Sequence, residues 1–188
     1  MRTVEPRPTL FRLSGEDGIQ LKKILIKNFT AIDETIIHLG QFTVIVGANG
    51  AGKSSVLQAM HWMFQSGRNP TIQARPNVEK GSTLSEKDAT YMPSPDYRNA
   101  GHGAAYGNFK DTPQLDLHVE AQTQDGDILN AQMWIKSAKN EGLSVHVPTN
   151  SEFVTTLRDR KREFSSYIPG LAGIPLSEEK RTKLIGPK

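Results

Sequence analysis

The chain has 188 residues, of which 36% are hydrophobic, 23% charged and 7% aromatic, a composition typical of a soluble globular protein. Its net charge of +3, from 23 Lys and Arg against 20 Asp and Glu, permits a nucleic-acid partner without requiring one. The absence of cysteine excludes disulfides and thiolate metal sites. No apolar run approaches a membrane span and the N-terminus lacks a signal-peptide core, so we expect a cytoplasmic protein with no membrane partner.

The N-terminal part predicts a tail followed by three strands. Residues 1–17 carry two prolines and mixed charges, and are expected to form the tail. Residues 19–29 (IQLKKILIKNF) alternate enough, and are rich enough in Ile and Leu, to form a strand, and residues 35–39 (TIIHL) predict a second strand after a turn. Residues 41–46 (QFTVIV) are nearly all apolar, which is typical of a strand buried on both faces.

A helix is predicted from Gly52 or Lys53 to about Gln65, with a wide apolar face that should pack against the sheet. The residues of this face are Val56, Leu57, Ala59, Met60, Met63 and Phe64. Residues 66–113 follow as a long excursion rich in Gly, Pro, Ser and Asn, without clear periodicity. A stretch of that length inside a compact domain is usually functional or mobile.

Strand signals resume in the C-terminal half. Residues 115–121, 128–136 and 143–147 carry strand signals and are separated by Asp-Gly and Glu-Gly dipeptides, which predicts an antiparallel meander. Ser151 is then a candidate helix cap, with Val154, Leu157 and Phe164 expected on one helical face. The last 21 residues (168–188) contain three prolines and are expected to form a connecting loop.

Residues 47–54 (GANGAGKS) fit the pattern G-x-x-x-x-G-K-[ST] between a predicted strand and a predicted helix. The glycines allow main-chain N–H groups to converge on phosphate oxygens, and the helix N-terminus adds attraction for an anion. Lys53, the one candidate catalytic residue, should reach the β- and γ-phosphates, while Ser54 offers a hydroxyl to Mg²⁺ and Ser55 contacts the α-phosphate. The predicted ligands are ATP and Mg²⁺, and the predicted binding residues are Gly47, Asn49, Gly50, Ala51, Gly52, Lys53, Ser54 and Ser55.

Residues 19–65 resemble the opening of ATPases of the SMC/RecF class, which belongs to the ABC-type ATPases. The resemblance rests on IKNF at 26–29, the short second strand and GANGAGKSS at 47–55, and it covers residues 114–148 loosely. It implies an α/β P-loop NTPase fold of the ABC/SMC head type, with a mixed sheet around the P-loop and an antiparallel β-subdomain. Many members carry Arg or Lys directly after the N-F pair, where Thr30 and Ala31 stand here.

The resemblance also indicates which parts of a complete ATPase are missing from this sequence. Members of the class continue into a coiled coil and a C-terminal lobe with a signature motif and an acidic Walker B strand. The nearest candidate for that strand, LDLHVE, has alternating acidic residues, and neither a Leu-Ser-Gly-Gly motif nor a Gln within 166–173 is present. Residues 18–188 are therefore expected to be an ATP-binding N-terminal head lobe, with 151–188 leading toward a missing coiled coil or C-terminal lobe.

The resemblance implies an ATPase that acts on DNA. The expected partners are DNA, the C-terminal lobe, a second head in a homodimer, and a nuclease or accessory subunit; ATP binding would drive head engagement, and hydrolysis would release it. DNA repair, chromosome maintenance and antiphage defence are all compatible roles, the SMC-like subunit of Lamassu-type systems being one example. The alternative is a regulatory nucleotide-sensing module that gates a nuclease with little turnover. A transporter ATPase is disfavoured because the IKNF opening is of the SMC type.

Several weaker features have an ordinary and a functional interpretation. The basic run at 158–162 (RDRKR) predicts either a solvated helix face or a contact with DNA phosphates. The aromatic residues and Arg of the excursion, together with His102, are expected to contact a base, nucleic acid or a partner subunit. Both tryptophans are expected in the core, the five histidines lack metal-ligand spacing, and Asp96 and Asp116 do not form a convincing catalytic pair. The excursion residues concerned are Tyr91, Tyr97, Arg98 and Tyr106.

Overall fold

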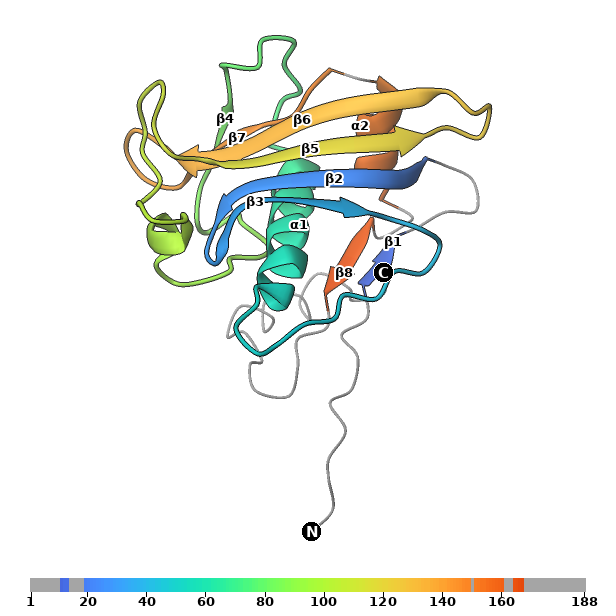
Figure 1. The fold of residues 1–188 in the computed structure, drawn as a ribbon. Helices are drawn as coiled ribbons and strands as arrows, with labels where there is room; N and C mark the ends of the chain where they lie inside the picture. The colour runs from blue at the N-terminus through green and yellow to red at the C-terminus, as the bar shows by residue number, and fades with distance from the viewer. Residues whose placement is uncertain (1–10, 14–18, 150, 161–163, 168–188) are drawn as a thin grey trace, which may run out of the picture.

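The computed structural model of the chain describes residues 11–13, 19–149, 151–160 and 164–167. Its largest feature is an open antiparallel sheet of six strands, crossed on one face by the helix α1 (Lys53–Arg68) (Figure 1). The strands are β2 (Gln20–Phe29), β3 (Ile32–His38), β4 (Ser82–Leu84), β5 (Leu115–Gln122), β6 (Ile128–Ser137) and β7 (Leu143–His146). Their order across the sheet is β3-β2-β5-β6-β7-β4, so β3 and β4 form its two edges.

The predicted strands at 19–29 and 35–39 and the predicted meander are confirmed. β2 pairs with β3 on one side and with β5 on the other, and Ile26 lies opposite Thr35 and Leu117 in the two registers. Side chains alternate as the sequence predicts, because the odd-numbered residues of β5 are buried and the even-numbered ones are only half-buried. One face of the sheet is thus apolar and covered.

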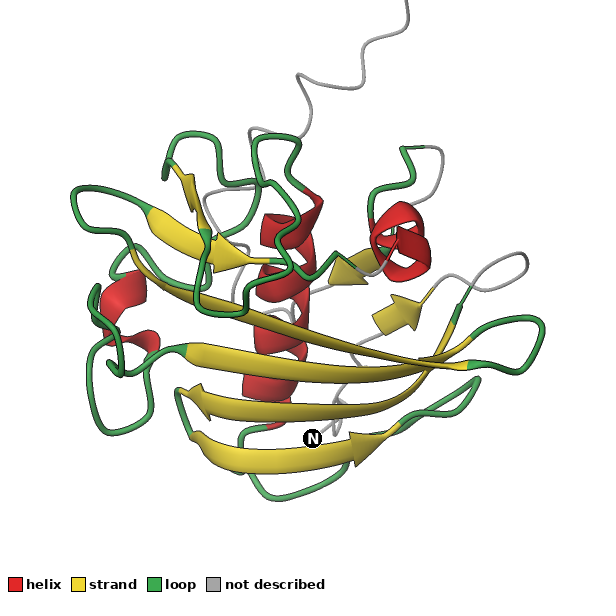
Figure 2. Ribbon diagram, turned by 90° about the horizontal axis from the view of Figure 1, so that it is seen from above, coloured by secondary structure: helices red, strands yellow, loops and turns green. Residues whose placement is uncertain are grey.

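The apolar face of α1 packs against this sheet as predicted, and the strands run across the helix axis in both views (Figures 1 and 2). Trp62 is fully buried at the centre of the contact, with its ring centre 6.0 Å from that of Phe29 at the end of β2. The rings of Tyr97 and Tyr106 lie 6.4 and 6.2 Å away on the same indole. Trp134 is buried as well, but on the outer face of the sheet and outside the core cluster, so the expectation of a tryptophan in the main core is confirmed for Trp62.

The predicted strand at residues 41–46 is wrong, and with it the mixed sheet around the P-loop. The segment has no regular secondary structure, and Phe42, Val44 and Val46 are 76%, 60% and 84% exposed. Within the segment, only Ile45 packs partly against the core, as Leu39 does just before the segment. The physical reason is the lack of a neighbour, because no described strand lies beside this segment to pair with its main chain.

The long excursion is more ordered than its composition predicts. Its first residues complete α1, and it contains β4 and a short 3₁₀ helix, η1 (Tyr97–Ala100). Tyr91, Tyr97 and Tyr106 are buried in the main core, with exposed fractions of 6% or less, so the expectation that these rings contact a base, nucleic acid or a partner is wrong. Their apolar area stabilises the excursion against the sheet and α1.

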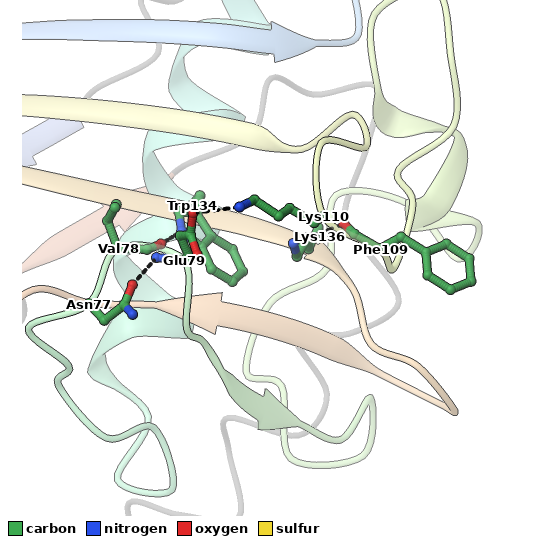
Figure 3. A network of polar contacts seen from close by, with 7 residues as sticks. All are labelled: Asn77, Val78, Glu79, Phe109, Lys110, Trp134 and Lys136. Carbon is green, nitrogen blue, oxygen red and sulfur yellow. Dashed lines mark hydrogen bonds and ion pairs between the residues drawn. The ribbon is translucent and has the colours of Figure 1, made fainter.

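Polar contacts join two stretches of the excursion to each other and to β6 on the outer face of the sheet (Figure 3). The indole Nε1 of Trp134 donates a 2.6 Å hydrogen bond to the carbonyl of Val78, and the ammonium of Lys136 lies 4.8 Å from the centre of the Trp134 ring. An ion pair of 3.0 Å joins Lys110 to Glu79, one residue from each stretch. With the 3.2 Å hydrogen bond from Lys136 to the carbonyl of Phe109, these contacts connect residues 78–79 with residues 109–110 over the strand.

The remaining elements lie near the two ends of the described chain. β1 (Phe11–Leu13), inside the predicted tail, pairs antiparallel with β8 (Ser165–Tyr167). The helix α2 (Ser151–Leu157) begins at the predicted cap but ends before Phe164, which is buried just ahead of β8, so the expectation of one helical face reaching that residue is wrong. The predicted loop at 168–188 lies outside the described residues.

Candidate nucleotide-binding site

The glycine-rich loop at residues 47–52 leads directly into α1. Gly50 and Gly52 have φ angles of +83° and +81°, in the left-handed region that side chains disfavour. The N–H of Val56 donates to the carbonyl of Gly52 at 3.0 Å, which starts the helix, and the N–H of Ala51 donates to the carbonyl of Ala48 at 3.2 Å, which closes a turn. A Cβ built at Gly50 would meet no atom within 4 Å, so the loop is open on that side.

Lys53 is the first residue of α1, and its side chain folds back over the loop. Its ammonium donates two hydrogen bonds of 2.7 Å, to the carbonyls of Gly47 and Ala48. A Cβ at Gly47 would lie 3.9 Å from the Lys53 side chain, so the two ends of the loop are in close approach. The positive charge predicted to contact phosphate therefore lies at the loop itself.

Ser54 and Ser55 occupy the first turn of α1 and differ in their surroundings. Ser54 is exposed, whereas Ser55 is half-buried and its Oγ accepts a 2.6 Å hydrogen bond from the hydroxyl of Thr30. Asn49 and Ala51 are exposed on the loop. All the predicted binding residues thus belong to one contiguous loop and helix end.

The turn between β2 and β3 packs against one side of this loop, a contact that the sequence did not predict. A Cβ at Gly52 would lie 3.7 Å from side-chain atoms of Ala31 and Ile32, so the turn packs directly on the loop. Thr30 supplies the polar contact to Ser55. The only signal in the sequence was the departure from the family pattern at Thr30 and Ala31.

The loop fits a nucleoside triphosphate with Mg²⁺. Left-handed glycines, an open side at Gly50 and a helix N-terminus without an acidic residue in its first turn are all compatible with an anion. Lys53 supplies the positive charge and Ser54 an exposed hydroxyl oxygen, the ligand type that Mg²⁺ prefers.

The other candidate groups are placed away from this chemistry or serve the fold. Asp116 is on the outer face of the sheet and accepts a 2.8 Å hydrogen bond from Gln114, and burial raises the pKa of its carboxyl. The carboxylate of Asp96 accepts a hydrogen bond from the side-chain amide of Asn99 at the start of η1. Within the described residues, no group of three or more His, Asp or Glu side chains could hold a metal ion.

Arg158 is one of the basic residues for which a solvated face or a DNA contact was expected. Its guanidinium instead donates to the main-chain carbonyls of Gly67 and Ile72, so for this residue both interpretations are wrong. Arg160 is exposed, and residues 161–162 of the run lie outside the described residues.

Comparison with known proteins assigns the region that contains this loop to a protein family. A family model described as AAA ATPase domain matches residues 20–168, more than half of the chain. A protein named OLD nuclease, from Thermus scotoductus, is 45% identical over 40 residues, which are 21% of this chain and 8% of that protein. No solved structure matches the chain. Within the described residues, no helix has the length and apolar character needed to cross a membrane.

Proposed function

Since the chain belongs to the AAA ATPase domain family, we propose that it is the ATP-binding half of an SMC/RecF-like ATPase that acts on DNA. The observation that carries this proposal is the complete GANGAGKS loop, with left-handed Gly50 and Gly52 directly ahead of α1. Family membership supports ATPase activity in general.

Each residue of the loop has a defined part in holding the nucleotide. The main-chain N–H groups of the loop and first helical turn bind phosphate oxygens, and Lys53 releases its carbonyl partners to contact the β- and γ-phosphates. Ser55 binds the α-phosphate, and Ser54 holds Mg²⁺. When bound, Mg²⁺ neutralises phosphate charge and polarises the phosphoryl oxygens.

The exposed apolar residues at 41–46 support a second ATPase lobe as a partner. Phe42, Val44 and Val46 are large, apolar and exposed, and they immediately precede the nucleotide loop. An apolar surface of this kind beside a binding site is typical of an interface. We place there a lobe that supplies the Walker B carboxylate, and we expect a second head to engage when ATP is bound.

An ATPase of this class has three candidate biological settings. DNA repair, chromosome maintenance and antiphage defence, including a Lamassu-type system, all use ATPases of this class. A second candidate is a nucleotide-sensing module that gates a nuclease with little turnover, and the similarity to a protein named OLD nuclease favours it. The test uses the two-lobe protein, that is, this chain together with the C-terminal lobe that we propose as its partner. DNA-stimulated ATP hydrolysis by this protein would support an ATPase that acts on DNA. Tight nucleotide binding without turnover would support the nucleotide-sensing module.

Calorimetric titration of the two-lobe protein with Mg²⁺ and a non-hydrolysable ATP analogue tests nucleotide binding itself. We expect Lys53→Ala to weaken binding by about 3 kcal/mol, roughly 150-fold, because a charge-assisted contact to phosphate is lost. Lys87→Ala removes the same charge from an exposed site in the excursion and should bind as the wild type does. If Lys53→Ala kept wild-type affinity, the loop would not be the phosphate site.

A further inference from the structure

The β2–β3 turn is connected to the nucleotide loop by one side-chain hydrogen bond. The hydroxyl of Thr30, between the two strands, donates to the Oγ of Ser55 in the first turn of α1 at 2.6 Å. The two residues are 25 positions apart, and their hydroxyls are the only polar groups through which this turn reaches α1 in the described part of the chain. Thr30 therefore contacts a residue that is predicted to bind a nucleotide phosphate.

Thr30 is held in a backbone conformation that its side chain disfavours. Its φ is +46°, and Asn28 two residues earlier has a φ of +57°. A β-branched residue in the left-handed region is a genuine outlier, and such strain persists only where surrounding contacts impose it. Glycine would relieve this strain, but it would also remove the hydroxyl that reaches Ser55.

The contacts that impose this conformation come from residues 98–106 of the excursion. The N–H of Thr30 donates to the carbonyl of Ala100 at 2.7 Å, and the N–H of His102 donates to the side-chain oxygen of Asn28 at 2.6 Å. The hydroxyl of Tyr106 donates to the carbonyl of Asn28 at 2.7 Å. A ring nitrogen of His102 also lies 2.9 Å from the carbonyl of Thr30.

Residues 98–106 thus form a clamp on the turn, and this clamp is anchored in the core. Tyr106 is 3% exposed, and its ring packs on Trp62 of the same helix that carries Ser55. The hydroxyl of Tyr97 donates to the carbonyl of Gly142 at 2.8 Å, which fixes η1 to the sheet. The excursion therefore braces the turn from the core side while Ser55 contacts it from the loop side.

We propose that Thr30 is a positioning residue of the nucleotide site, which orients Ser55 toward a nucleotide phosphate and is itself held by the clamp at residues 98–106. This inference rests on the proposed function. A serine hydroxyl has one hydrogen and two acceptor sites, so the bond from Thr30 occupies an acceptor site and leaves the Ser55 hydrogen for a phosphate oxygen. A hydroxyl that accepts a bond is also a stronger donor.

Affinity for Mg²⁺ and a non-hydrolysable ATP analogue, measured by calorimetry on the full-length protein, tests this role. We expect Thr30→Val to bind about fivefold more weakly, because it keeps the β-branched shape and removes only the hydroxyl. Thr30→Ser, which keeps the hydroxyl, should bind within about twofold of wild type. Thr30→Ser and Thr30→Ala also differ by this hydroxyl, and neither has a β-branch, so Thr30→Ala should bind more weakly than Thr30→Ser.

A double-mutant cycle separates positioning from a general structural effect. In a Ser55→Ala background, Thr30→Val and Tyr106→Phe should cause no further loss of affinity, because both act through the Ser55 hydroxyl. Additive losses, or equal affinity of wild type and Thr30→Val, would overturn the inference. Thermal unfolding midpoints, expected to be unchanged for Thr30→Val, detect an effect on the fold. If the wild type itself bound no nucleotide, the proposed function would fail instead.

Discussion

Arg158 and Ile72 are joined by a 2.7 Å hydrogen bond from the guanidinium Nη2 to the main-chain carbonyl, across 86 residues of sequence. A second bond of 3.2 Å runs from Nε to the carbonyl of Gly67 in the last turn of α1. Burial lowers the pKa of Arg158 from its ordinary value, although the group stays charged at neutral pH. This side chain thus satisfies the carbonyl of Gly67, which the end of α1 leaves unpaired, and ties it to the carbonyl of Ile72 beyond the helix.

Replacement of Arg158 by alanine should lower the free energy of unfolding by about 2 kcal/mol, because two main-chain carbonyls lose a charged donor. Urea unfolding followed by circular dichroism measures this loss. Arg160→Ala is the matched control, since Arg160 is an exposed residue of the same basic run and should leave stability within about 0.5 kcal/mol. Equal losses in both variants would contradict the structural role of Arg158.

Gly142 should not tolerate a side chain. Its φ is +86°, and a Cβ there would collide with the main-chain carbonyl of Leu84 on the edge strand β4. We expect Gly142→Ala to destabilise the protein by about 3 kcal/mol, from backbone strain together with displacement of β4. Gly126 is the control, since its φ is +93° but its nearest atom, in Gln122, lies 4.0 Å from a Cβ. Gly126→Ala should cost only about 1 kcal/mol in the same unfolding measurement.

Asp116 should make stability depend on pH. Burial raises the pKa of its carboxyl above the ordinary value of 3.8, against the opposing effect of the hydrogen bond from Gln114 and of the nearby cations. The folded state therefore binds this proton more tightly than the unfolded state, so the contribution of Asp116 to stability falls as pH rises through the folded-state pKa.

The variant Asp116→Asn isolates this contribution. Asparagine keeps an oxygen that can accept from Gln114 and carries no charge, so the variant should melt at a higher temperature than the wild type at pH 7. The difference should shrink as pH falls toward 4, because the wild-type carboxyl then takes up its proton. Melting curves at several pH values check this, and a gain that grew on acidification would contradict it.

Ser54 and Ser55 should respond differently to removal of magnesium. Ser54→Ala is expected to weaken nucleotide binding about tenfold in Mg²⁺ buffer and to have little effect in EDTA, because we propose that its hydroxyl holds the metal. Ser55→Ala should weaken binding in both buffers, since we propose that its hydroxyl binds a phosphate. Fluorescence titration with a labelled nucleotide gives the six dissociation constants, for the wild type and both variants in each buffer, and equal losses for Ser54→Ala in both buffers would remove its metal role.

Much of the fold could be predicted because the relevant signals are local. Strand signals separated by hairpin-turn dipeptides predicted the strands at 115–121, 128–136 and 143–147, and the apolar face of the helix predicted that α1 packs against the sheet. The position of the glycine-rich loop directly before α1 was also predicted, because its motif is contiguous and the helix that follows is part of the pattern.

The failures have a common physical origin in long-range contacts. The apolar run at 41–46 has the composition of a buried strand, but a strand also needs a neighbour for its main chain, which composition does not report. Thr30 gave no sign of a left-handed conformation, since that conformation is imposed by the hydrogen bond to Ala100, 70 residues away, and by the bond from Tyr106 to Asn28 in the same turn. The pairing of β1 with β8 is similarly non-local.

The uncovered segment QFTVIV at residues 41–46 also has a consequence for how the protein behaves during synthesis. Six residues without charge, proline or glycine, with unpaired main chain and β-branched side chains, form a template onto which identical segments can stack. Copies that remain uncovered should therefore associate into β-rich aggregates as concentration rises. Prompt docking of a companion surface would then act as protection against aggregation, quite apart from any catalytic benefit.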